Sequence, residues 1–223
     1  MAADRTRPGR RLAALAATLP LVLVPTLAGC GSSDTASQSG APIKDLRVPD
    51  DDGYRGIKLD TAYRVPSVPL TDTAGASYDL ATQQERTIVF FGYTKCPDIC
   101  QIVMSTIASA VARLDRADRA RVQVLFVTTD PARDTRKVLR AYLDRYDPTF
   151  QGVTGPLARI EALGKPMGID VAQGQKLPSG GYEVDHTTNV ISVRDGRGDL
   201  VWTASTSPTD LASDLHEVLG VDG

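Results

Sequence analysis

Apolar and polar residues alternate along this chain in two different periods, one typical of strands and the other typical of helices. Two short runs rich in β-branched and aromatic residues, Thr87–Tyr93 and Val122–Thr129, predict buried strands. Between them, from Pro97 to Leu114, apolar residues recur every three or four positions, which predicts a helix. The same patterns predict later strands near 150–153, 181–185, 188–193 and 200–204, and helices at 135–146, 156–163 and 208–219.

The stretch before the first buried strand predicts a β-hairpin. Apolar and polar residues alternate at 63–70, a turn signal follows at 71–75, and a second arm is expected at 76–80. The preceding residues, 42–60, are polar and contain two glycines, so we expect them to be irregular.

The order of these elements indicates the fold class. Strands that alternate with helices imply an α/β protein with a partly parallel sheet covered on both faces. Near the C-terminus two strands are joined by the turn Asp195–Gly198, and a last helix follows them. Together these features predict a thioredoxin-like sandwich with an added N-terminal β-hairpin.

The N-terminal region predicts an export signal rather than a part of the fold. Four arginines precede an apolar stretch from Leu12 to Leu27, which ends in the run Leu27-Ala28-Gly29-Cys30. This pattern resembles a bacterial lipoprotein signal, in which the cysteine receives the lipid. An uncleaved transmembrane anchor is the alternative, but two prolines and a length below the about 20 apolar residues of a span argue against it. We therefore expect a signal peptide at 1–29, a flexible tether with lipidated Cys30 at 30–41, and a folded domain at 42–223.

Lipid chains on Cys30 would hold the mature protein at the extracytoplasmic face of the cell membrane. The pair Arg10-Arg11 leaves export by the twin-arginine route open, although the surrounding residues match that signal poorly. The whole chain has a formal net charge of −2, and the signal segment holds four arginines and one aspartate, which leaves the mature protein at about −5. With no basic patch in the sequence, nucleic acid is not an expected partner.

Two of the three cysteines, Cys96 and Cys100, lie close together after the first buried strand. Such a pair can form a disulfide or hold a soft metal ion. Pro97 suits the first position of a helix, which would place Cys96 at a helix N-terminus, where N–H groups and the helix dipole stabilise a thiolate. Lys95 adds a positive charge next to it. A purely structural disulfide is the alternative, but it would close so short a loop that it would stabilise the fold little.

The chain has two histidines, and they differ in their surroundings. His216 lies in the last predicted helix and is expected at the surface without a role. His186 lies just before a predicted strand and would complete a set of two thiolates and one imidazole, which suits Cu(I) and can also hold Cu(II) or Zn(II). Asp185 is a candidate to accept the other imidazole N–H of that histidine.

The segment Thr128–Thr135 follows the end of the second buried strand, where α/β sheets tend to place ligand sites. Asp134 or Thr135 is suited to cap the next helix. Asp130, at the tip of the strand, is a candidate to face the metal.

Four motifs of this sequence resemble those of the Sco/SenC family, the assembly proteins of cytochrome c oxidase. They occur in the order of that family and are the runs Phe91–Cys100, Thr129–Thr135, Tyr146–Gly155 and Asp185–Thr187. The resemblance implies a thioredoxin-like fold and copper bound by Cys96, Cys100 and His186. It also implies a partner, the oxidase subunit that carries the binuclear CuA site, and a membrane-tethered protein. A copper donor chaperone is a further partner that it leaves open.

Two functions follow from this set of residues, and they do not exclude each other. The first is a metallochaperone that delivers copper to the CuA centre without being a turnover enzyme. The second is a thiol-disulfide oxidoreductase that uses Cys96 and Cys100 to reduce the cysteines of that centre, although such enzymes typically have two residues between their cysteines rather than three. A thiol peroxidase is a weaker alternative, since Cys100 lies too close to serve as the usual distant resolving cysteine.

Overall fold

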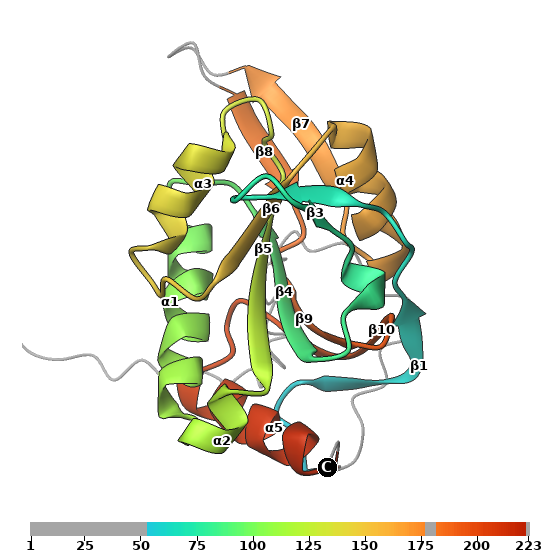
Figure 1. Cartoon of the computed structure of the whole chain (residues 1–223), viewed down its shortest axis with the longest axis vertical. Helices are drawn as coiled ribbons and strands as arrows, with labels where there is room; N and C mark the ends of the chain where they lie inside the picture. The colour runs from blue at the N-terminus through green and yellow to red at the C-terminus, as the bar shows by residue number, and fades with distance from the viewer. Residues whose placement is uncertain (1–52, 177–181, 222–223) are drawn as a thin grey trace, which may run out of the picture. The chain divides into compact units, whose positions relative to one another are not determined.

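A mixed eight-stranded sheet forms the centre of the protein (Figure 1). The computed structural model describes residues 53–176 and 182–221, and at 172–176 and 182–186 only the course of the backbone. The strands of the large sheet follow the order β1-β10-β9-β4-β5-β6-β2-β3, and β7 and β8 form a separate pair. Their bounds are β1 Ile57–Arg64, β2 Leu70–Asp72, β3 Ser77–Tyr78, β4 Arg86–Gly92, β5 Val122–Thr128, β6 Gln151–Thr154, β7 Val171–Lys176, β8 Tyr182–His186, β9 Val190–Arg194 and β10 Arg197–Trp202.

Helices cover both faces of this sheet, as the sequence predicts. On one side lie α1, α3 and α5, and on the other lie α4 and the β7–β8 pair (Figure 1). The bounds are α1 Ile99–Arg113, α2 Arg116–Arg119, α3 Arg136–Leu143, α4 Leu157–Gly164 and α5 Pro208–Val221, with short 3-10 helices η1 Leu80–Thr82 and η2 Lys165–Met167. None of the helices within the described ranges combines the length and the apolar character that crossing a membrane requires.

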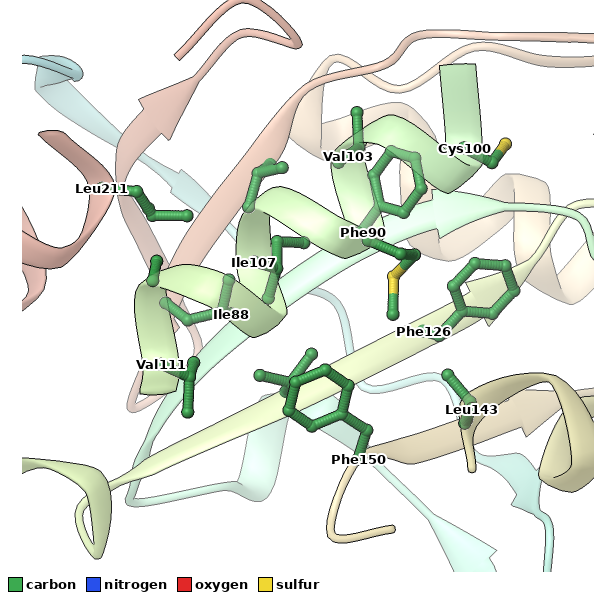
Figure 2. Close-up of a cluster of buried hydrophobic side chains, with 14 of the residues drawn as sticks. Ile88, Phe90, Cys100, Val103, Ile107, Val111, Phe126, Leu143, Phe150 and Leu211 are labelled. Carbon is green, nitrogen blue, oxygen red and sulfur yellow. The ribbon is translucent and has the colours of Figure 1, made fainter. Parts of the chain in front are cut away.

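The central strand β4 contributes to two apolar cores because its side chains point alternately to the two faces of the sheet. Phe90 packs with Phe126 and with helix α1 in the cluster drawn in Figure 2, where Ile107 and Cys100 also lie. The neighbouring residue, Phe91, packs on the opposite face, in the cluster that α4 covers. All seven residues of β4 are buried, which explains the continuous apolar run of this strand in the sequence.

The pairing of β4 determines which loops meet at one end of the sheet. β4 runs parallel to β5, with Gly92 opposite Thr128, and antiparallel to β9, with Phe90 opposite Val190. The chain that leaves β4, the chain that leaves β5 and the chain that enters β9 therefore lie at the same end of the sheet.

The N-terminal part of the domain differs from the prediction. Residues 57–64, expected to be partly irregular and partly a hairpin arm, form the edge strand β1 and pair with β10. The half-buried apolar residues of this strand pack on the cluster that α4 covers, and they are Ile57, Leu59 and Tyr63. Their alternation is weak because the pairing of β1 with β10 shifts in register between Lys58 and Tyr63. The observed hairpin is shorter than predicted, since β2 and β3 pair at only two positions. The other side of β2 pairs with β6. The predicted signal peptide and tether lie outside the described residues.

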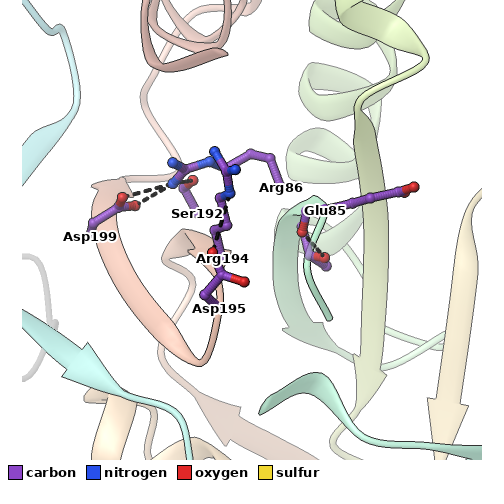
Figure 3. Close-up of polar contacts among 7 residues, drawn as sticks. Glu85, Arg86, Ser192, Arg194, Asp195 and Asp199 are labelled. Carbon is purple, nitrogen blue, oxygen red and sulfur yellow. Dashed lines mark hydrogen bonds and ion pairs between the residues drawn. The ribbon is translucent and has the colours of Figure 1, made fainter. Parts of the chain in front are cut away.

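A buried ion pair joins three neighbouring strands near the start of β4 (Figure 3). Arg86 is 4% exposed, and its Nη1 donates to both carboxylate oxygens of Asp199, at 2.7 and 2.8 Å, and to Ser192 Oγ at 3.0 Å. The side chain of Asp199 remains 39% exposed. The guanidinium is therefore buried where it meets this carboxylate, whereas the carboxylate still reaches water.

A second buried carboxylate fixes the point where the chain enters the domain. Asp214 of α5 is 1% exposed and accepts hydrogen bonds from the N–H groups of Arg55 and Gly56, at 2.8 and 2.7 Å, and from Trp202 Nε1 at 2.7 Å. It thereby joins the segment before β1 to the last helix. Because three N–H groups depend on it, this carboxylate is a structural anchor of the β1–β10 edge.

His216, expected at the surface without a role, pairs with an acidic residue. Its Nδ1 lies 2.5 Å from Asp118 Oδ2 of α2, and this hydrogen bond raises the pKa of His216 above its ordinary value. Because the pKa is raised, the protonated histidine stabilises the folded state at any pH below the pKa of histidine in the unfolded chain, about 6.5. This stabilisation is lost as the pH rises through the higher pKa of the folded state.

We therefore expect the melting temperature of the parent protein to fall more between about pH 5 and about pH 8 than that of His216→Gln. Thermal unfolding of both proteins across this range measures the difference. The same pH dependence in the two proteins would contradict the pairing.

Candidate metal centre

The two cysteines of the CxxxC motif lie where β4 passes into α1. The helix begins at Ile99, whose N–H donates to the Asp98 carboxylate at 2.5 Å. The prediction that Pro97 is the first helical residue is therefore wrong, because Asp98 caps the helix after it. Cys96 lies in the loop before the helix, whereas Cys100 is the second residue of α1.

The sulfur of Cys96 nevertheless lies at the N-terminus of the helix. The N–H of Cys96 donates to the Tyr93 carbonyl at 3.2 Å, which folds the loop back toward α1. The helical N–H of Cys100 then donates to Cys96 Sγ at 3.3 Å. A sulfur that accepts from such an N–H is stabilised as a thiolate by the end of the helix.

Both cysteines are reduced thiols in a largely apolar setting, with Cys96 4% exposed and Cys100 fully buried. A hydrogen bond to Cys96 and burial together raise the pKa of Cys100. Both effects disfavour the thiolate of Cys100.

Gly92, the last residue of β4, is the reason why the Cys100 sulfur fits against the sheet. A Cβ at this position would lie 3.2 Å from Cys100 Sγ, 3.0 Å from Phe90 Cε1 and 3.1 Å from Phe126 Cε2. All three neighbours are buried, so none of them can yield freely.

We expect Gly92→Ala to lower the free energy of unfolding by about 1–3 kcal/mol, because the added methyl group overpacks the core beside Cys100. Chemical denaturation measures this. Gly220→Ala is the matched control, since nothing lies within 4 Å of the Cβ that it adds, and we expect it to preserve or raise stability. Equal stabilities of the two variants would contradict the close approach at Gly92.

The loop that carries Cys96 is held by a buried carboxylate from the second motif. Asp134 Oδ2 accepts from the Thr94 N–H at 2.9 Å and from Thr128 Oγ1 at 2.7 Å, and Oδ1 accepts from Thr94 Oγ1 at 2.6 Å. Burial raises the pKa of Asp134, and the hydrogen bonds from the two threonines oppose this effect. The helix cap is Thr135, whose Oγ1 accepts from a helical N–H, so Asp134 serves the loop instead.

Asp130, the candidate at the tip of β5, has a partner within its own loop. It is 2% exposed and forms an ion pair with Arg133, whose guanidinium lies over the Tyr93 ring at 5.8 Å from its centre. Its carboxylate is thus bound to an arginine in this structure. Its approach to a metal stays a prediction.

His186, the expected third ligand, ends β8 opposite Val171 of β7. Four residues later Val190 begins β9, paired with Phe90 of β4. The backbone at His186 therefore leads into the same end of the sheet from which β4 continues to Cys96. At Asp185 and His186 the structure describes only the backbone. Among the side chains that it does describe, no group of three Cys, His, Asp or Glu residues could hold a metal.

Two positions of the site were missed by sequence reasoning. Gly92 carried no signal, because a single glycine at the end of a strand has many explanations. The interaction of Asp134 with Thr94 joins residues that are 40 positions apart, so the capping role was the nearest local explanation. The interaction of Asp134 depends on how β4 and β5 align, and the close approach at Gly92 depends on how α1 packs on the sheet. The sequence pattern specifies neither.

The sheet order, the helices on both faces and a CxxxC pair after a central parallel strand define an α/β protein of the thioredoxin-like class with a dithiol centre. A family model described as SCO1/SenC matches residues 62–220. Because this match covers well over half of the chain, the protein belongs to the SCO1/SenC family.

Solved and curated relatives support this assignment. Apo Sco1 from Thermus thermophilus has a TM-score of 0.68 at 28% identity, covering 74% of this chain and 96% of that one. ScoI from Bradyrhizobium japonicum, solved with copper bound, has a TM-score of 0.62 at 28% identity, covering 69% and 98%. The "Putative copper-binding protein" of Stutzerimonas stutzeri is 33% identical over 130 residues, which make up 58% of this chain and 63% of that protein. The chain spans less than two thirds of the length of the curated relatives that it matches.

Proposed function

We propose that this protein is a metallochaperone that binds copper and delivers it during assembly of the CuA centre of cytochrome c oxidase. The observation that carries the proposal is the contact between the cysteines, in which the Cys100 N–H meets Cys96 Sγ at 3.3 Å inside a buried site. Membership of the SCO1/SenC family and the copper-bound relative from Bradyrhizobium japonicum support it.

The donor set fits the cargo. Two thiolates select soft ions such as Cu(I), and an imidazole is suitable for Cu(I) and Cu(II) alike. In this proposal Cys96 and Cys100 supply the sulfurs and His186 supplies the nitrogen, with Asp185 accepting the second imidazole N–H. Because a bound copper ion displaces the proton of Cys100, copper uptake is expected to weaken as the pH falls.

The same proposal includes the location of the protein. A lipid on Cys30 and a tether at 30–41 would keep the domain at the extracytoplasmic face of the membrane, after removal of residues 1–29. There it would face the oxidase subunit that carries the CuA site, and a copper donor would load it.

A thiol-disulfide oxidoreductase is the second candidate, and one observation favours it. Cys96 and Cys100 are both reduced and in direct contact, so they can form a disulfide without a large movement of the backbone. In this role the reduced pair would pass two electrons to a disulfide between the cysteines of the CuA site, so that this disulfide becomes a dithiol and Cys96 and Cys100 become a disulfide.

An exchange experiment with the purified CuA-bearing subunit separates the two functions. We would mix the full copper-loaded chain, in mild detergent, with the copper-free subunit in its dithiol form and follow the CuA absorption. Transfer of copper supports the chaperone. If copper stays on the chain while the copper-free chain reduces the disulfide form of the subunit, the oxidoreductase is the better description. His186→Ala is the matched variant, since it should abolish transfer and leave dithiol exchange intact.

A further inference from the structure

Asp134 is a completely buried carboxylate that connects two loops at the dithiol end of the sheet. Its three donors come from both sides, because Thr94 belongs to the loop after β4 and Thr128 ends β5. Thr94 precedes Cys96 by two residues. The carboxylate thus reaches across to the segment that carries the first sulfur of the site.

The hydrogen bonds of Asp134 continue the connection between β4 and β5 after the strands end. The last pair of these strands is Gly92 with Thr128, and beyond it the Thr129 N–H donates to the Gly92 carbonyl at 2.7 Å. Two residues after Gly92, the Thr94 N–H donates to Asp134 Oδ2 at 2.9 Å. Without this acceptor a backbone N–H in a half-buried loop would lose its partner.

Asp134 is itself held in a defined place. Its N–H donates to the Asp130 carbonyl at 2.9 Å, which closes a turn after β5, and Thr135 caps helix α3 immediately afterward. Thr128 Oγ1 donates to the carboxylate and accepts from the Asp130 N–H at 3.0 Å. Because Asp134 is held in place, its hydrogen bonds fix the position of Thr94 in the loop after β4.

We propose that Asp134 is a positioning residue that holds the Cys96 loop in the geometry required for copper binding. Asp134 acts through Thr94 and does not contact the metal. The part of this proposal that concerns copper rests on the proposed function, whereas the part that concerns the position of Cys96 does not.

The test compares two buried carboxylates that each accept three hydrogen bonds. Asp134→Ala removes the three hydrogen bonds at the Cys96 loop. Asp214→Ala removes the three hydrogen bonds at the β1–β10 edge. Asp134→Asn is the rescue variant, because the amide oxygen can take the place of Oδ2 while the Thr94 hydroxyl turns to accept from the amide nitrogen. Each full-length variant would be purified in mild detergent, checked for cooperative unfolding and titrated with Cu(I) against a chelator.

We expect Asp134→Ala to bind copper about tenfold or more weakly than the parent, as is typical when a group that orients a ligand is lost. Asp134→Asn and Asp214→Ala should stay within about threefold of the parent, even where Asp214→Ala is the less stable protein. Parent-like affinity of Asp134→Ala, or an equal loss in Asp214→Ala, overturns the proposal.

A second variant keeps the test decisive if Asp134→Ala does not fold. Thr94→Val removes only the hydroxyl that donates to Oδ1. We expect it to weaken copper binding about threefold and to speed amide hydrogen exchange at residues 94–96. If both the copper affinity and the rate of hydrogen exchange stay at the parent values, the proposal is overturned.

A measurement without copper separates this proposal from the proposed function. The rate at which iodoacetamide alkylates Cys96, followed by mass spectrometry as a function of pH, reports the surroundings of its thiolate. We expect the profile to shift in Asp134→Ala and not in Asp214→Ala. If the parent chain binds no copper, the proposed function fails, and this profile alone decides whether Asp134 positions Cys96.

Discussion

Replacing Cys100 with serine is expected to weaken Cu(I) binding by at least about a hundredfold, because a hydroxyl is a hard and weakly acidic donor that cannot replace a thiolate. The structure places Cys100 where its sulfur can act as a ligand together with that of Cys96. Cys100 is fully buried, its N–H contacts the Cys96 sulfur, and its side chain lies against Gly92 in the core.

Competition with a chelator of known Cu(I) affinity measures this change. Met104→Leu is the matched control, because Met104 is equally buried on the same helix and the substitution preserves volume and apolar character. We expect the control to bind copper as the parent does. Parent-like affinity of Cys100→Ser would show that the dithiol is not the copper site.

The second large effect is expected at the ion pair of Arg86. Asp199→Ala should lower the free energy of unfolding by about 3 kcal/mol, because it leaves a buried guanidinium without its carboxylate. The side chain of Arg86 is 3% exposed, so water cannot readily replace the lost partner. By contrast, the double variant Arg86→Met/Asp199→Ala should recover most of this loss, since it removes the buried charge as well.

Urea denaturation of the single and double variants measures both effects. Arg119→Ala serves as the surface control, because Arg119 is 46% exposed in its pair with Asp147, and its loss is expected to cost less than about 1 kcal/mol. A loss at Asp199→Ala no greater than that of the surface control would contradict the importance of the buried pair.

Much of the fold could be predicted from the sequence because the central elements have strong patterns. The apolar run at 87–93 and the helical spacing after Asp98 correspond to β4 and α1. Strand β1 was missed because its apolar residues are few, half-buried and interrupted by a shift of register against β10. The start of α1 was misplaced because Pro97 and Asp98 are both suitable at a helix start, and only the observed hydrogen bond shows that Asp98 is the cap.

The pair of cysteines was evident from the sequence, whereas the residues that support their loop were not. Cys96 and Cys100 were evident from their spacing, and the structure brings them into contact. His186 stays a predicted ligand, supported by the pairing of β9 with β4, which leads its backbone to the same end of the sheet. Asp134 could not be assigned, because its partner Thr94 is near only after β4 and β5 align in parallel register.

The most direct test of the central claim is a copper titration of the reduced full chain and of His186→Ala, in mild detergent. His216→Ala is the matched control, since it removes the other histidine of the chain. Binding is read by chelator competition and by the thiolate-to-Cu(II) charge-transfer band. We expect tight one-to-one binding in the parent and in His216→Ala, with a band that collapses in His186→Ala. Weak binding in the parent, unaffected by loss of His186, would contradict this expectation and leave Cys96 and Cys100 as a redox pair.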